Sequence, residues 1–123
     1  VFHLGACSST TEWDGRYIMQ NNFEYSKVLL NWCQSCDTKF IYASSASVYG
    51  LAPNGFIEKR ICEAPINMYA FSKFQFDQYV RSVSAKLNSQ TVGLTLFQEV
   101  ASPGLNFRGL ANGSRSIRVS KAW

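Results

Sequence analysis

The chain has 123 residues, of which 46% are hydrophobic and 16% are charged. This composition excludes a disordered or fibrous protein and allows a single domain with a buried core. No apolar run reaches the length of a membrane span, and the first residues lack the features of a signal peptide. We therefore expect a cytoplasmic protein that does not contact a membrane.

The net charge of +4 comes from the end of the chain. Residues 1–99 hold as many acidic as basic side chains, whereas residues 100–123 hold basic side chains and no acid. Dispersed basic charges with few aromatic residues between them are typical of a solvated segment. We predict a divergent basic tail at 101–123 and no nucleic-acid partner.

Four cysteines include Cys33 and Cys36, which have the spacing of many zinc and redox sites. A structural zinc site needs a second closely spaced pair, but Cys7 and Cys62 are isolated and His3 is the only histidine. We therefore predict reduced thiols and no metal site.

The segments before the tail alternate between strand-like and helix-like patterns. They are a strand at 1–5, a helix at 12–35, a strand at 39–44, a helix that begins near Tyr69 and a strand at 90–97. This alternation predicts an α/β fold whose parallel sheet has three strands and right-handed crossovers. The inward stripe of the first helix is predicted to contain Ile18, Tyr25, Leu29 and Trp32. Asn22 interrupts that stripe, and both Asn21 and Asn22 need hydrogen-bond partners if the face is buried.

Tyr69 and Lys73 lie four residues apart, so both side chains leave the same face of the second helix. An ammonium beside a phenol favours loss of the phenol proton, which suits proton transfer. The pair begins an apolar stripe that continues through Phe76, Val80, Val83 and Leu87. We expect no acid beside Lys73 on this buried face, so a bound ligand would be its partner. The alternative is a lysine whose ammonium reaches water beside an ordinary core tyrosine.

Several polar stretches follow the ends of the predicted strands. They are Gly5–Ser8, Ser44–Ser47 and the residues after Phe97. Ligands of open parallel sheets bind outside the carboxyl ends of the strands. Because Tyr69 and Lys73 begin the helix at the same edge, we predict one site there.

These residues resemble the extended short-chain dehydrogenase/reductase family, in which a serine at a strand end, within the pattern Ser-Ala-Ser/Thr-Val-Tyr-Gly, is paired with Tyr-x-x-x-Lys. Here the three are Ser45, Tyr69 and Lys73. The resemblance implies the second half of a Rossmann-type doubly wound parallel sheet. It makes 1–100 a partial NAD(P)-binding domain that begins at the family's fourth strand, and 101–123 the start of a substrate-binding region.

Residues 6–15, 21–27 and 67–81 are similar in detail to the epimerases of this family that act on ADP-bound glycero-manno-heptose. The resemblance implies an NADP-dependent homo-oligomer, with NAD as the alternative cofactor, that inverts one carbon of the sugar for the lipopolysaccharide core of Gram-negative bacteria. The reaction would be a transient oxidation. Tyr69 would exchange the hydroxyl proton, Ser45 would hydrogen-bond the reacting oxygen and Lys73 would bind the nicotinamide ribose.

The resemblance also assigns the remaining site residues. The residues that it places beside the cofactor are Leu4, Gly5, Ala6, Cys7, Ser8, Asn21, Lys73 and Val100. Ser45 and Gln98 would contact the substrate, although the family carries asparagine at the position of Gln98. Arg108 stands where these epimerases have a lysine that acts as a second acid/base. It keeps the charge, but a guanidinium that stays protonated at neutral pH is a poor proton carrier.

The family's phosphate-binding pattern, G-x-G-x-x-G, does not occur in these 123 residues. The resemblance therefore implies a fragment that is inactive alone. Two alternatives stay open. One is another nucleotide-sugar epimerase or dehydratase of the same family, and the other is a noncatalytic remnant that binds a partner through its sheet edge or basic tail.

Overall fold

The computed structural model describes residues 1–51, 59–97 and 116–122. The elements in these ranges are β1 (Phe2–His3), α1 (Gly15–Met19), a π-helical turn (Gln20–Glu24), α2 (Tyr25–Ser35), β2 (Phe40–Ser45), α3 (Met68–Val83), β3 (Thr91–Phe97) and β4 (Ser116–Ala122). Short 3₁₀ turns lie at Ala46–Tyr49, Arg60–Cys62 and Ser84–Lys86. The strands predicted near 1–5, 39–44 and 90–97 are confirmed, as is the helix that begins near Tyr69.

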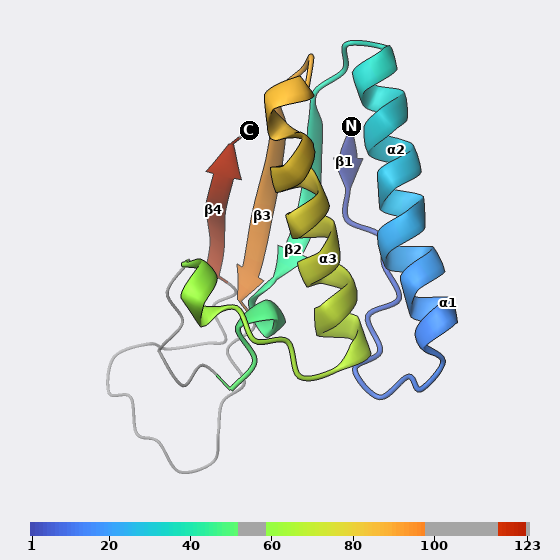
Figure 1. Cartoon of the computed structure of the whole chain (residues 1–123), viewed down its shortest axis with the longest axis vertical. Coiled ribbons are helices and arrows are strands. Elements are labelled where there is room, and N and C mark those ends of the chain that lie inside the picture. Colours follow the sequence, from blue (N-terminus) through green and yellow to red (C-terminus); the bar gives the residue numbers. More distant parts are fainter. Residues whose placement is uncertain (52–58, 98–115, 123) are drawn as a thin grey trace.

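The described strands form one sheet in the order β1-β2-β3-β4 (Figure 1). β1 runs parallel to β2 and β2 runs parallel to β3, so the α/β fold with three parallel strands is confirmed. β4 pairs antiparallel with β3 and lies in the basic tail, where we predicted no element. A strand at a sheet edge is defined by hydrogen bonds from its neighbour, and the local sequence does not contain that information.

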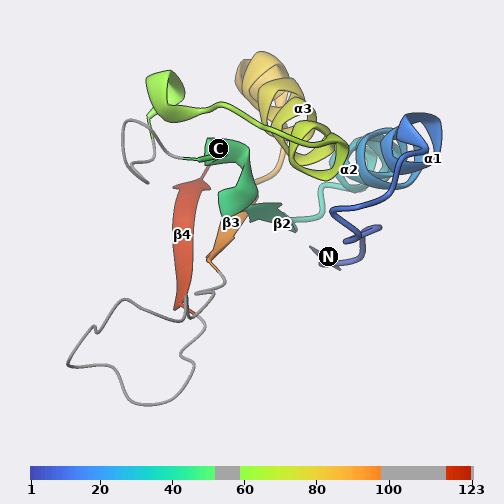
Figure 2. The ribbon, with the colours of Figure 1, turned by 90° about the horizontal axis from the view of Figure 1, so that it is seen from below.

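Helices α1, α2 and α3 all lie on one side of the sheet (Figure 2). Alternate residues of β2, Phe40 and Tyr42, are buried against these helices and stack on one another at 6.0 Å. The ring of Phe76 from α3 meets that of Tyr42 edge to face at 4.8 Å. The buried cluster comprises Leu30, Cys33, Phe40, Tyr42, Phe76 and Val80. This core fixes α3 against β2.

The first long helix, predicted at 12–35, begins at Gly15. The carboxylate of Asp14 caps it by accepting a hydrogen bond from the Tyr17 amide at 3.0 Å. The predicted stripe is wrong at Tyr25 and Trp32, which are 54% and 55% exposed. The buried positions are Ile18, as predicted, and Asn22, Ser26, Leu30 and Cys33. The π-helical turn has more residues per turn than an α-helix, so it changes which later side chains face the core.

The four cysteines all lie within the described ranges and form no disulfide with one another. Burial raises the pKa of the Cys33 thiol, which favours its inert protonated form. No set of three or more acidic, cysteine or histidine side chains within the described ranges is arranged to hold a metal ion. In the same ranges, no helix combines the length and the apolar character that a membrane crossing requires.

Candidate functional site

The first turns of α3 lie beside the carboxyl end of β2, where the predicted serines are (Figure 1). Asn67 caps α3 because its side-chain oxygen accepts a hydrogen bond from the Ala70 amide at 2.8 Å. The cap places Tyr69 in the first turn of the helix and Lys73 one turn later. Ser45 ends β2 and begins the 3₁₀ turn Ala46–Tyr49. Neighbouring elements thus supply Ser45, Tyr69 and Lys73.

Lys73 is buried, as predicted, with 6% of its surface exposed. Its Nζ donates a hydrogen bond to the backbone oxygen of Ala43 in β2 at 3.0 Å. Burial lowers the pKa of Lys73 to about 8, although the negative charge of Asp77 opposes this shift. The expectation that no acid lies near Lys73 is therefore wrong, since Asp77 follows it by one turn of α3.

The depressed pKa of Lys73 makes the free energy of unfolding depend on pH. In the unfolded chain the group keeps its ordinary value of 10.5, whereas in the folded chain the value is about 8. The charge on Lys73 therefore opposes folding below pH 8, and this penalty disappears between pH 8 and 10.5. We expect the stability of the wild type, relative to Lys73→Met, to rise by up to about 3 kcal/mol between pH 7 and 10.

Urea unfolding of both chains across that pH range would measure the difference. Lys86→Met is the matched control, because Lys86 is an exposed lysine in the turn that follows α3. The difference in free energy of unfolding between Lys86→Met and the wild type should not change with pH. If the difference in free energy of unfolding between Lys73→Met and the wild type also does not change with pH, the prediction is contradicted.

The serines at the end of β2 have different partners. The hydroxyl of Ser44 donates to Asp77 at 2.6 Å and is buried. The Oγ of Ser45 lies 2.8 Å from the Oγ of Ser47 and accepts a hydrogen bond from the Ser47 amide. Ser45 is half-buried, so of the two adjacent serines it is the one that lies nearer the surface.

The loop after β1 is joined to α3 through Asn22. The side chain of Asn22 accepts a hydrogen bond from the Cys7 amide at 2.8 Å and donates to the Cys7 carbonyl oxygen at 3.0 Å. It also donates to the Ser72 hydroxyl at 3.0 Å, and that hydroxyl donates to the backbone oxygen of Tyr69 at 2.7 Å. Our sequence-based assignment overlooked Asn22. The available signal was its place on an inward stripe, where a buried amide needs partners.

Asn22→Ala is expected to lower the free energy of unfolding by about 1–3 kcal/mol, because it leaves the paired backbone groups of Cys7 without their partners. Asn21→Ala is the matched control, since Asn21 is exposed and donates to the Tyr17 carbonyl oxygen. The control should change stability by no more than about 0.5 kcal/mol. If chemical denaturation shows that the two variants lose the same free energy of unfolding, then the hydrogen bonds of Asn22 between the loop after β1 and α3 do not stabilise the fold as expected.

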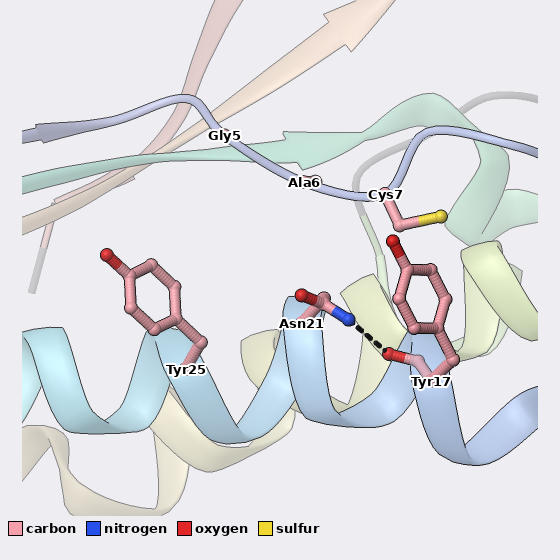
Figure 3. A pocket seen from close by; sticks show the side chains of 6 residues that line it. All are labelled: Gly5, Ala6, Cys7, Tyr17, Asn21 and Tyr25. Atoms are coloured by element: carbon pink, nitrogen blue, oxygen red, sulfur yellow. Dashed lines mark hydrogen bonds between the residues drawn. The ribbon is translucent and has the colours of Figure 1, made fainter.

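An open cavity of about 260 Å³ lies between the loop after β1 and the first long helix (Figure 3). It is lined by Gly5, Ala6, Cys7, Tyr17, Asn21 and Tyr25. Four of the residues predicted to contact the cofactor, Gly5, Ala6, Cys7 and Asn21, are thus brought together. Leu4 and Ser8 flank this stretch and are exposed. The volume suits part of a ligand rather than a whole dinucleotide.

The remaining predicted site residues cannot be placed. Gln98, Val100 and Arg108 lie outside the described residues. Their predicted roles, in substrate binding, cofactor binding and acid/base chemistry, stay predictions.

Three solved structures share this fold. ADP-L-glycero-D-manno-heptose-6-epimerase from Helicobacter pylori is 39% identical over 75% of this chain and 29% of that chain, with a TM-score of 0.65. UDP-N-acetylglucosamine 4-epimerase from Methanobrevibacter ruminantium M1 is 25% identical over 89% of this chain and 37% of that chain, with a TM-score of 0.69. A short-chain dehydrogenase/reductase superfamily protein from Agrobacterium tumefaciens, with bound NAD, is 26% identical over 76% of this chain and 29% of that chain, with a TM-score of 0.65.

The chain therefore spans about a third of the length of these relatives, between 29% and 37%. The sequence model of the NAD-dependent epimerase/dehydratase family matches residues 1–120. That match covers nearly the whole chain. The chain belongs to the NAD-dependent epimerase/dehydratase family.

Proposed function

We propose that the chain is the part of an NADP-dependent epimerase that carries its proton-transfer residues, and that the substrate is an ADP-bound glycero-manno-heptose. The observation that carries the proposal is Lys73, a buried ammonium that lies one turn after Tyr69 and donates to Ala43 near the carboxyl end of β2. The identity of 39% to the heptose epimerase, against 25% to the UDP-sugar epimerase, favours the heptose. The product would serve the lipopolysaccharide core, and the whole enzyme would be a cytoplasmic homo-oligomer.

The residues present fit a nicotinamide cofactor. The cavity beside the loop after β1 offers backbone groups and the amide of Asn21, and the ammonium of Lys73 can donate to a ribose hydroxyl. A nicotinamide bound there would supply the hydride acceptor and donor for a transient oxidation of the sugar carbon. NAD is the alternative to NADP.

The chain's own residues move the proton. Tyr69, as phenolate, takes the proton of the sugar hydroxyl as the carbon is oxidised to a ketone, and returns it on reduction. The Ser45 hydroxyl donates to the reacting oxygen. Lys73 supplies a positive charge one turn after Tyr69 on the same helix. The family resemblance assigns Gln98 to the sugar, Val100 to the cofactor and Arg108 to a positive charge near the reacting carbon.

A chimera tests the proposed function. Residues 1–97 of this chain would replace the matching segment of the Helicobacter pylori heptose epimerase, and interconversion of the two ADP-heptose epimers would be followed by chromatography. We expect the chimera to turn over. A second chimera, built in the same way in the UDP-N-acetylglucosamine 4-epimerase, is the comparison, because that relative is similar over more of the chain.

The two chimeras separate the alternatives. Turnover by the heptose chimera alone supports the proposal, whereas turnover by the UDP-sugar chimera alone favours the other epimerase. Circular dichroism shows whether each chimera is folded. Two folded chimeras without turnover would indicate a noncatalytic remnant.

A further inference from the structure

Asp77 is a buried acid of α3 whose two carboxylate oxygens both bind β2. The hydroxyl of Tyr42 donates to one oxygen at 2.7 Å, and the hydroxyl of Ser44 donates to the other at 2.6 Å. Tyr42 and Ser44 lie two residues apart, so their side chains share one face of the strand. An acid whose two oxygens both accept hydrogen bonds is satisfied as a carboxylate.

Lys73 completes a three-point contact between α3 and the end of β2. Its Nζ binds the carbonyl oxygen of Ala43, the residue between Tyr42 and Ser44. Two helix residues four apart therefore hold three consecutive residues of the strand. The next residue along the strand is Ser45, so its place relative to α3 is set by the contact immediately before it.

The neighbouring strand leaves room for this contact. Gly93 of β3 pairs with Tyr42, and a Cβ atom at Gly93 would lie 2.8 Å from the Tyr42 hydroxyl oxygen and 2.9 Å from Cζ. Real Cβ atoms do not approach other atoms so closely. Any larger residue at this position would therefore push the Tyr42 ring away from Asp77.

We propose that Asp77 is a positioning residue of the site, whose carboxylate holds Tyr42 and Ser44 so that Ser45 stays in place beside Tyr69 and Lys73. The inference rests on the proposed function. Asp77 acts through the strand end and makes no contact with the reacting atoms.

The titratable and charged groups that act on Asp77 and Lys73 come from several elements. They are His3 on β1, Tyr42 on β2, Glu63 after the turn Arg60–Cys62, and Arg81 on α3. Burial raises the pKa of Asp77, whereas its hydrogen bonds from Ser44 and Tyr42 and the charge of Arg81 oppose the rise. Asp77 in turn raises the pKa of Lys73 against the effect of burial. Loss of the Asp77 charge should therefore leave Lys73 with the burial effect alone.

The test uses the 123-residue chain with ¹³C-labelled lysine and the substitution Asp77→Asn, which keeps the size of the side chain. We expect the NMR titration midpoint of Lys73, assigned with Lys73→Arg, to move at least about one pH unit below its wild-type value. Amide hydrogen exchange at residues 43–47 should become about tenfold faster or more. Glu24→Gln, at an exposed acid, is the control and should change neither quantity.

An Asp77→Asn chain with the wild-type midpoint and wild-type exchange overturns the proposal. If that chain does not fold, Tyr42→Phe and Ser44→Ala decide, because each removes one hydrogen bond and keeps the charge of Asp77. Faster exchange at residues 43–47 with an unchanged Lys73 midpoint then supports the proposal, and unchanged exchange in both variants overturns it. None of these measurements needs turnover, so they stand apart from the chimera assays.

Discussion

Arg81→Met is expected to lower the free energy of unfolding by about 3–5 kcal/mol, the largest change among the substitutions considered. Arg81 binds Glu63 through both terminal nitrogens, and the two side chains are only 6% and 4% exposed. Without the guanidinium, the Glu63 carboxylate stays buried with a hydrogen bond from Gln78 at 3.2 Å but no countercharge. Urea unfolding monitored by circular dichroism measures the loss.

Two comparisons identify the cause of that loss. Lys27→Met breaks the exposed ion pair with Glu24, in which 28% and 56% of the side chains are accessible, and should cost less than about 1 kcal/mol. The double variant Glu63→Gln with Arg81→Met removes both charges and should recover part of the stability. A double variant less stable than Arg81→Met would contradict an uncompensated charge as the cause.

Tyr69→Phe, introduced into the heptose chimera, is expected to lower kcat by a factor of about 10²–10⁴. The substitution keeps the ring in the first turn of α3 and removes only the hydroxyl that would exchange the substrate proton. Because the ring packs as before, KM and the thermal unfolding midpoint should change little. Steady-state rates with ADP-heptose and melting curves measure these quantities.

Tyr79→Phe is the matched control for this variant. Tyr79 lies on the same helix, and its hydroxyl donates to Asn31 at 3.3 Å on the exposed side of the helix pair. The same chemical change there should leave kcat at its wild-type value. A Tyr69→Phe chimera that retains full kcat would exclude Tyr69 as the proton-transfer residue, whatever the result for Tyr79.

The parallel strands and α3 could be predicted because their local sequences agree with their environment. Phe40 and Tyr42 alternate with residues of the other face, and Lys73, Phe76 and Val80 follow helical spacing on a buried stripe. β4 was not predicted, because its strand conformation depends on pairing with β3 across a long stretch of chain. The stripe of α2 was wrong because a π-helical turn is not visible in residue spacing.

The candidate site could be predicted only in part. Ser45, Tyr69 and Lys73 form a pattern with a chemical rationale, and the structure brings their elements together. Asp77 was missed because an acid on a helix is normally solvated, whereas here the hydroxyls of β2 and the charge of Arg81 favour its burial. Those contacts join residues far apart in sequence, so no local pattern indicates them.

The parallel arrangement of the strands also has a consequence for how the chain folds. Phe40 pairs with Thr91, and the Ile41 amide binds the Val1 carbonyl oxygen, so each pairing spans a whole intervening helix. Such non-local contacts form only after a long loop has closed, which slows folding. Until closure, the aromatic rings of Phe40 and Phe76 are open to other unfolded chains. The topology that gathers the strand ends at one edge therefore makes refolding yield depend on protein concentration.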